Sequence, residues 1–219
     1  MGTNVYIDGF NLYNGSVRNT PFKWLDLGRL CATLLRGHTI HRIRYFTALV
    51  LDFQHDPQAS SRQDMYIRAL STISNLTVHK GGWFASRPVL RPQYPLAYRN
   101  PERYPKRPPQ FVQVQRIEEK RTDVDLGTYL LMDCFFNDFD EAAVISNDSD
   151  LVLPIETVRR FGKRIGVINP HHPKRMSSHL RQAADYHFRT INRSVLARCQ
   201  FPPTLIDAQG RSITKPASW

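Results

Sequence analysis

The feature that most constrains the fold is a regular alternation of short apolar runs and amphipathic segments along the chain. The apolar runs are rich in β-branched and aromatic residues, which pack well in a sheet that is covered on both faces. They are Val5–Ile7, Ile40–Leu51, Leu76–Lys80, Phe111–Glu119, Glu141–Ser146 and Arg164–Ile168. The segments with helical spacing are Asp26–Gly37, Pro57–Ser74, Asp123–Phe135, Leu151–Phe161 and Ser178–Asp185. Strands that alternate with helices predict an α/β fold with a central, mainly parallel sheet.

Length and composition indicate one main domain, because 219 residues of which 41% are hydrophobic can fill one large core. The three cysteines, Cys31, Cys134 and Cys199, are odd in number and far apart, so we expect reduced core residues and a reducing compartment. No window approaches the roughly 18 apolar residues that a membrane span needs. We therefore expect a soluble, cytoplasmic protein with no membrane partner. The sequence does not indicate an oligomeric state.

The charge balance is strongly basic. Thirty Lys and Arg residues against nineteen Asp and Glu give a formal charge of +11 and a pI near 9.9. Such a bias attracts polyanions by long-range steering and by the release of counterions. Nucleic acid is the expected partner.

The segment between Gly81 and Pro109 differs in composition from the rest of the chain. Its stretch RPVLRPQYPLAYRNPERYPKRPP contains seven prolines, five arginines, one lysine and three tyrosines. Proline at this density removes backbone donors and fixes φ, so we expect a long basic loop or flap. As a nucleic-acid clamp it would offer cations to phosphates and rings to unpaired bases. The cations are Arg87, Arg91, Arg99, Arg103, Lys106 and Arg107, and the rings are Tyr94, Tyr98 and Tyr104. The alternative is a solvated insertion without a binding role.

Two of the predicted strands end in acidic turns, in the stretches VYIDGFN and VISNDSD, and a third acidic cluster, KRTDVD, begins a helix. In open α/β sheets ligands bind at the carboxyl ends of the strands. If the three stretches meet there, the carboxylates that converge are Asp8, Asp123, Asp148 and Asp150, with Asp125 as a further candidate. Clustered carboxylates stay ionised only beside a cation, and Mg²⁺ or Mn²⁺ suits oxygen ligands best. Each aspartate alone could instead be a helix cap or a turn residue.

Three stretches resemble the NYN domains of the PIN-like nuclease superfamily: VYIDGFNLY, EEKRTDVDLG and VISNDSDLVLPIETVRRFGKRIGVI, in this order. The ending GRSITKPASW is also similar to bacterial members. The resemblance implies a three-layer α/β/α PIN-like (Rossmannoid) fold. It implies an NYN/PIN-like nuclease domain over residues 1–190, with the Pro/Arg-rich insertion at about 81–109, and a C-terminal extension over 191–219.

The resemblance also implies roles for single residues. Metal-binding, catalytic carboxylates would be Asp8, Asp123, Asp148 and Asp150, and Asn11 and Ser146 would support them. Arg121 and Thr122 depart from the small or apolar pair that usually precedes the middle aspartate, and Asp125 is a second acid there. Asp123 is the preferred ligand of the two, and the choice stays open. Asn147 stands where glycine is common, and asparagine tolerates the left-handed turn that glycine would supply.

The function that follows is a metal-dependent ribonuclease, which hydrolyses single-stranded or structured RNA by attack of a metal-activated water. Endonucleolytic and exonucleolytic cleavage are both compatible with the sequence. The alternative from another class is a non-catalytic RNA-binding or regulatory module on the same fold. A phosphatase that phosphorylates an aspartate would need Asp-x-Asp directly after an apolar strand, which neither Asp8 nor the Asp123–Asp125 stretch provides. The histidines His171, His172 and His179 are typical of a solvated basic patch.

Overall fold

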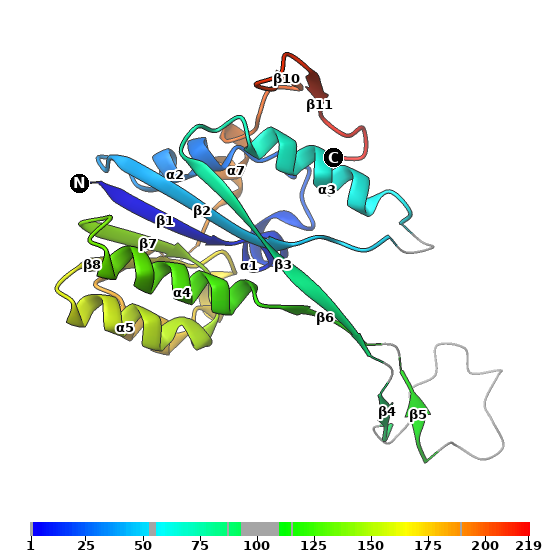
Figure 1. Ribbon diagram of the computed structural model, residues 1–219, viewed down its shortest axis with the longest axis horizontal. Helices are drawn as coiled ribbons and strands as arrows, with labels where there is room; N and C mark the ends of the chain where they lie inside the picture. The colour runs from blue at the N-terminus through cyan, green and yellow to red at the C-terminus, as the bar shows by residue number, and fades with distance from the viewer. Residues whose placement is uncertain (1, 53–55, 87, 93–109, 115, 189) are drawn as a thin grey trace.

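The computed structural model describes residues 2–52, 56–86, 88–92, 110–114, 116–188 and 190–219 (Figure 1). Its centre is a seven-stranded sheet with the order β6-β3-β2-β1-β7-β8-β9. The strands are β1 (Thr3–Asp8), β2 (Ile40–Ala48), β3 (Leu76–Ser86), β6 (Arg116–Lys120), β7 (Glu141–Ile145), β8 (Arg164–Ile168) and β9 (Tyr186–Phe188). Six of them run parallel, and β6 pairs antiparallel with the edge of β3. The predicted α/β fold with a mainly parallel sheet is confirmed.

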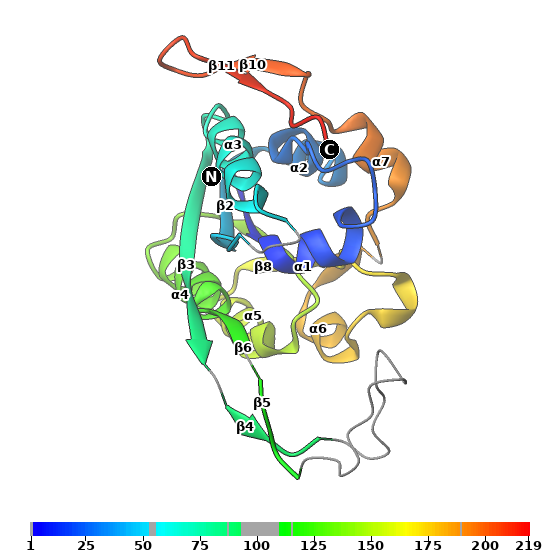
Figure 2. The ribbon, with the colours of Figure 1, turned by 90° about the vertical axis from the view of Figure 1, so that its right-hand side faces the viewer.

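Helices cover both faces of the sheet and complete three layers (Figures 1 and 2). One face carries α1 (Gly9–Leu12), α2 (Leu27–Leu34), α3 (Ala59–Leu70) and α7 (Arg193–Arg198). The other face carries α4 (Thr122–Phe135), α5 (Val152–Arg160) and α6 (Ser178–Ala183). Side chains alternate along β1 between the two cores: Val5 and Ile7 pack on the first face, and Tyr6 packs on the second.

The topology marks one place on the sheet for a ligand. The chain first builds β1, β2 and β3 toward one edge, and then builds β7, β8 and β9 toward the other. The strand order therefore reverses beside β1. The carboxyl ends of β1 and β7 therefore form a switch point, the place where open α/β sheets bind their ligands.

The prediction that Gly81–Pro109 is entirely loop is wrong for its first part. β3 continues to Ser86 and pairs with β6, and a two-stranded ribbon of β4 (Val89–Leu90) and β5 (Val112–Gln113) follows. The prolines begin only at Pro88, so the preceding residues keep their backbone donors and can form a strand. The predicted strand Phe111–Glu119 is correspondingly divided between β5 and β6. Residues 93–109 lie outside the described residues.

The ribbon leaves the body at the edge of the sheet that carries Asp8 (Figure 1). Asp8 pairs with Phe46 of β2, and Ala48 of β2 pairs with Gly81 of β3, so the rest of β3 extends beyond the carboxyl ends of its neighbours. β6 then returns antiparallel, with Lys120 opposite Gly82. It therefore delivers the first turn of α4 to the same edge.

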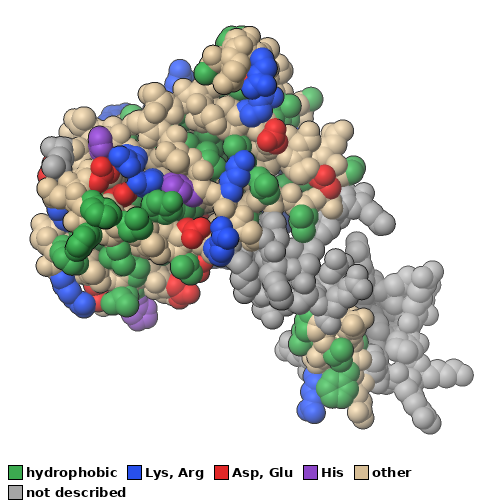
Figure 3. All heavy atoms as spheres, viewed as in Figure 1, with side chains coloured by type: hydrophobic (Ala, Val, Ile, Leu, Met, Phe, Trp, Pro, Cys, Tyr) green, Lys and Arg blue, Asp and Glu red, His purple; other side chains and the backbone are tan. Residues whose placement is uncertain are grey.

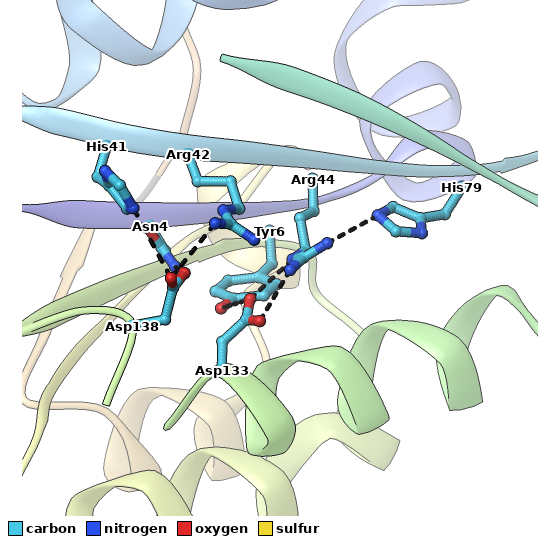
Figure 4. Close-up of polar contacts among 8 residues, drawn as sticks. All are labelled: Asn4, Tyr6, His41, Arg42, Arg44, His79, Asp133 and Asp138. Carbon is cyan, nitrogen blue, oxygen red and sulfur yellow. Dashed lines mark hydrogen bonds and ion pairs between the residues drawn. The ribbon is translucent and has the colours of Figure 1, made fainter. Parts of the chain in front are cut away.

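A buried polar cluster fastens α4 to the sheet (Figure 4). Asp133 of α4 accepts two hydrogen bonds from the guanidinium of Arg44, at 2.7 and 2.8 Å, and one from the Tyr6 hydroxyl at 2.6 Å. Arg44 also lies 3.2 Å from Nε2 of His79 and 4.6 Å from the centre of the Tyr129 ring. Burial opposes the charge of Arg44, but the hydrogen bonds that Arg44 donates to Asp133, together with the charge of that carboxylate and the nearby tyrosines, raise the pKa of the guanidinium. The guanidinium and the carboxylate form a buried ion pair, and three hydrogen bonds reach Asp133.

The outer faces of α4 and α5 expose large apolar side chains, which gather on the surface in Figure 3. Phe135 and Phe136 are 72% and 70% exposed, and Leu153 and Phe161 are also exposed. In the described part of the chain, no helix combines the length and the apolar character of a membrane span.

Residues beyond 185 add elements that lack a clear sequence pattern. β9 extends the parallel sheet by one strand, and α7 is followed by the hairpin of β10 (Thr204–Ile206) and β11 (Ser212–Thr214). Phe201, Ile213 and Trp219 pack against the first core. The predicted C-terminal extension therefore covers one face of the domain.

Candidate active site

Asp8 is placed by the end of β1 and the start of α1. It is the N-cap of α1, and its Oδ1 accepts the backbone N–H of Asn11 at 2.9 Å. A carboxylate satisfies free N–H groups at a helix start well. Its other oxygen, Oδ2, accepts the hydroxyl of Ser146 at 3.0 Å. Both carboxylate oxygens are thus held in place by neutral donors.

Ser146 connects the ends of the two central strands. It follows β7 directly, is fully buried, and donates to Asp8 while its Oγ accepts the backbone N–H of Asp148 at 3.1 Å. Asp148 in turn accepts the backbone N–H of Asp150 at 3.0 Å as N-cap of the short helix η3 (Ser149–Leu151). The serine therefore holds Asp8 and the Asp148 turn together at the switch point.

A third loop reaches the site from the end of β8. Asn11 Oδ1 accepts the backbone N–H of Asn147 at 3.2 Å and lies 2.9 Å from Nε2 of His171. The Asn147 side chain bonds the backbone of Arg175 and of Ser177, at 2.7 Å each. The loop over residues 169–177 is thereby fixed beside Asp8.

Two expectations need correction at this loop. His171 is partly buried and contacts the site, so a solvated patch describes only the exposed His172 and His179. The sequence feature that could have indicated this contact is the pair Asn169–Pro170, which ends β8 at the same edge of the sheet. Asn147 does not adopt a left-handed conformation; among the described non-glycine residues a positive φ is found for Arg121 and Asn137, at 83° and 59°. Asn147 acts through its side-chain hydrogen bonds.

The electrostatics set Asp8 apart. Burial raises the pKa of its carboxyl, and the charge of Asp148 adds to the increase, while the bonds from Asn11 and Ser146 act in the opposite direction. Neither Asp8 nor Asp148 forms an ion pair with a Lys or Arg in the described residues. Burial and the nearby charge of Arg175 lower the pKa of His171. The imidazole is therefore neutral at pH 7 and donates from Nε2 to Asn11.

The other predicted acids lie on η3 and at the start of α4. Asp150 is exposed on η3, and Asp123 and Asp125 lie in the first turn of α4, which contacts η3. Asp125 faces His79 closely enough to oppose the lowering of the pKa of that histidine by burial and Arg44. Over the described ranges, no three His, Cys, Asp or Glu side chains are grouped closely enough to hold a metal ion. The structure thus brings together two of the predicted acids, and the choice between Asp123 and Asp125 stays a prediction.

The oxygen donors present fit a hard divalent cation. Mg²⁺ is usually bound through one or two carboxylates, with water and substrate phosphate as its remaining ligands. Asp8 and Asp148 supply two carboxylates, and the raised pKa of Asp8 reflects a buried charge that lacks a protein cation. A bound cation would relieve that unfavourable state.

Of the predicted nucleic-acid contacts, Arg91 lies within the described residues. It is exposed beside the β4–β5 ribbon, and its guanidinium lies 5.3 Å from the centre of the Phe111 ring. The remaining predicted contacts, which lie outside the described residues, are Arg87, Tyr94, Tyr98, Arg99, Arg103, Tyr104, Lys106 and Arg107.

The central sheet covered by helices on both faces has the three-layer α/β/α architecture of a PIN-like fold, and two carboxylates lie at its switch point. The model of the NYN domain family matches residues 2–192, and the chain belongs to this family of nucleases. The match covers the sheet, the insertion and the whole candidate site.

Two individual proteins are similar over most of their length. The 6-hydroxy-3-succinoylpyridine 3-monooxygenase HspA of Pseudomonas putida is 29% identical over 245 residues, which cover 100% of this chain and 75% of that protein. A crystal structure of a protein of unknown function from Vibrio parahaemolyticus is similar with a TM-score of 0.50 and 15% identity, over 88% of this chain and 94% of that chain. The second likeness concerns the fold alone.

Proposed function

We propose that this chain is a metal-dependent ribonuclease that hydrolyses RNA phosphodiester bonds with Mg²⁺ or Mn²⁺. The observation that carries the proposal is the pair of carboxylates, Asp8 and Asp148, held by Ser146 at the switch point without a described basic partner. When bound, the ion would polarise the scissile phosphate and lower the pKa of an attacking water. No side chain needs to act as the nucleophile.

The residues around the pair have distinct roles in this proposal. Asp8 and Asp148 hold the ion, with Asp123 and Asp150 as the further predicted ligands. Ser146 and Asn11 fix the orientation of Asp8 through the bonds that its two oxygens accept. Neutral His171 donates to Asn11 and so fixes the amide that also receives the Asn147 N–H. The water and the phosphate would thus meet a preorganised set of oxygens.

The β4–β5 ribbon, which carries Arg91 at its end, supports RNA as the substrate. It projects from the carboxyl edge that carries Asp8, so a strand lying along it would reach the carboxylates. Arg91 and Phe111 place a cation and a ring together on the described part of the ribbon, which suits phosphate contact and base stacking. The net charge of +11 favours the approach of a polyanion.

The test compares Asp148→Asn with Asp64→Asn, an exposed acid on α3, in the cleavage of a fluorescent single-stranded RNA. Asp148→Asn should lose about 100-fold or more of the Mn²⁺-dependent rate, because metal stabilisation of the transition state contributes several kcal/mol. Asp64→Asn should cleave like the wild type, and EDTA should stop cleavage by the wild type and by Asp64→Asn. Cleavage by Asp148→Asn at the wild-type rate, or cleavage that survives chelation, would contradict the proposal.

The same cleavage assay, together with a gel-shift experiment, distinguishes the non-catalytic alternative from the ribonuclease. An RNA-binding or regulatory module would retain RNA in a gel-shift experiment and release no product at any Mn²⁺ concentration. It would also lack the stabilisation by divalent ions that a metal site provides.

A second candidate function comes from the similarity to the hydroxypyridine monooxygenase, which extends over the whole of this chain. If the chain has this second function, it would hydroxylate a hydroxypyridine with O₂ and an external two-electron reductant. Oxygen uptake with 6-hydroxynicotinate and a nicotinamide reductant, at a rate that depends on the protein concentration, would support it. Uptake at the rate of the protein-free control would exclude it for this substrate.

A further inference from the structure

A cavity of about 410 Å³ lies beside the candidate site, on the face of the sheet that carries α1 and α3. Its walls come from α1, the π-helix η1 (Tyr13–Val17), the end of β2, the start of α3 and the last residues of the chain. The aromatic side chains in its wall are Phe10, Tyr13, Tyr45, Tyr66 and Trp219. A cavity of this volume is suited to a small organic ligand.

The cavity and the carboxylate site share one turn of helix. Gly9 lines the cavity and directly follows Asp8. A Cβ at Gly9 would lie 2.8 Å from the hydroxyl of Tyr45 and 2.7 Å from the carbonyl oxygen of Phe46. The absence of a side chain at Gly9 therefore lets the Tyr45 wall pack directly against the turn that Asp8 caps.

The aromatic wall is held rigidly. The Tyr66 hydroxyl donates to the carbonyl of Leu25 at 2.8 Å, and burial raises its pKa well above the ordinary value, so it stays neutral. Trp219 contacts Tyr66 and Trp24 at centroid distances of 5.8 and 6.2 Å in edge-to-face geometry. Fixed rings of this kind offer apolar surface to a planar ligand at little cost in side-chain entropy.

Most polar groups of the cavity are already engaged. Arg62 donates a hydrogen bond to Asp56 at 2.6 Å. The side-chain amide of Gln63 donates to the carbonyl of Ala48 at 2.8 Å and accepts the backbone N–H of Val50 at 2.7 Å. Lys23 is partly buried and forms no ion pair or hydrogen bond with another described residue. It is the cation that remains for a ligand.

We propose that this cavity binds a planar heteroaromatic ring with an anionic substituent, the ring against the aromatic wall and the anion at Lys23. Two sources can supply this chemistry: a nucleobase with its phosphate, or a free hydroxypyridine acid. The proposal concerns binding and holds whether or not the chain hydrolyses RNA.

The experiment measures binding of 6-hydroxynicotinate, AMP and UMP by isothermal titration calorimetry, with cyclohexanecarboxylate as the non-aromatic control. Binding of the nucleotides alone identifies a nucleobase source, binding of 6-hydroxynicotinate alone identifies a free acid, and binding of both supports the shared chemistry. Binding of none of the three, or equal binding of cyclohexanecarboxylate, would overturn the proposal.

Two cavity variants test whether the ligand binds in this cavity. Ala59→Phe places a ring inside the cavity and should abolish binding, and Lys23→Ala should weaken it about fivefold, as expected for one ion pair. The matched control, Arg160→Ala, removes an exposed cation on α5 and should bind like the wild type. Thermal melting tests whether Ala59→Phe is folded. Wild-type affinity in both folded cavity variants would overturn the assignment of the site.

Discussion

Two buried carboxylates of this protein differ in what surrounds them. Asp133 receives a guanidinium at two contacts and a tyrosine hydroxyl, so its charge is balanced within the fold (Figure 4). Asp8 receives a serine hydroxyl and a backbone N–H, and the charge of a second carboxylate, Asp148, raises its pKa further. Asp133 fastens α4 to the sheet, whereas Asp8 is available to a cation from solution.

Removing the cation of the balanced cluster should produce the largest effect. Arg44→Met leaves Asp133 buried without its partner, so the free energy of unfolding should fall by about 3–5 kcal/mol. Urea denaturation measures the loss. The double variant Arg44→Met/Asp133→Leu should recover most of it, because no charge then stays buried. Arg160→Ala, which breaks an exposed pair with Glu156, should change stability by less than about 1 kcal/mol. A loss for Arg44→Met as small as that for Arg160→Ala would remove the contrast between the two carboxylates.

A smaller effect is expected from Ser146→Ala. The change leaves Oδ2 of Asp8 and the N–H of Asp148 without their shared partner, which should cost about 1–3 kcal/mol of stability. Because the serine bond lowers the pKa of Asp8, its loss should raise that pKa further and weaken Mn²⁺ binding. Calorimetry of Mn²⁺ binding to this variant and to Ser178→Ala, an exposed serine on α6, tests the expectation. Equal affinities in the two variants would show that Ser146 does not hold the site.

The smallest expected effect is a change in stability when Asp8 or Asp52 is replaced by asparagine, and the sign of the change should be opposite for the two residues. The pKa of Asp8 is raised in the folded state, so its stabilising contribution is present at low pH and is lost as the pH rises through its pKa. Asp8→Asn should therefore stabilise the metal-free protein at pH 7, by about 1 kcal/mol or less because some hydrogen bonding is lost. The gain should shrink as the pH approaches 4.

Asp52 provides the matched comparison. The hydroxyl and the backbone N–H of Ser60 lower the pKa of Asp52, so its contribution is present above its unfolded pKa and is lost on acidification. Asp52→Asn should accordingly destabilise the protein at pH 7. Thermal melts across pH 4 to 8 measure both variants. The same sign for both at pH 7 would contradict the electrostatic difference described above.

The sequence predicted the parts that depend on local pattern. Val5–Ile7 and Glu141–Ser146 are apolar runs that end in acidic turns, and their placement as central strands is confirmed. Asp26 caps the start of α2 as expected, whereas the helix already ends at Leu34, before the turn in which Gly37 has a positive φ. These signals lie within a few residues of the structure that they determine.

The parts that depend on where distant segments meet could not be predicted. His171 joins the site because the loop after β8 returns toward Asn11, at a separation of 160 residues. The end of β3 forms because β6 pairs with it, and periodicity alone does not show such a partner. The walls of the cavity come from Gly9, Tyr45, Tyr66 and Trp219, which no motif connects. Tertiary contact decides each of these cases.

The central claim is that Asp8 and Asp148 form an uncompensated pair that takes up a divalent cation. The most direct measurement is the melting temperature of the EDTA-treated protein during titration with Mn²⁺, for the wild type, Asp8→Asn, Asp148→Asn and the control Asp64→Asn. A ligand that binds the folded state alone stabilises it by about 2.7 kcal/mol at one hundred times its dissociation constant. The account predicts a rising melting temperature for the wild type and Asp64→Asn, and little change for Asp8→Asn and Asp148→Asn. Equal responses in all four proteins, or no response in the wild type, would contradict it.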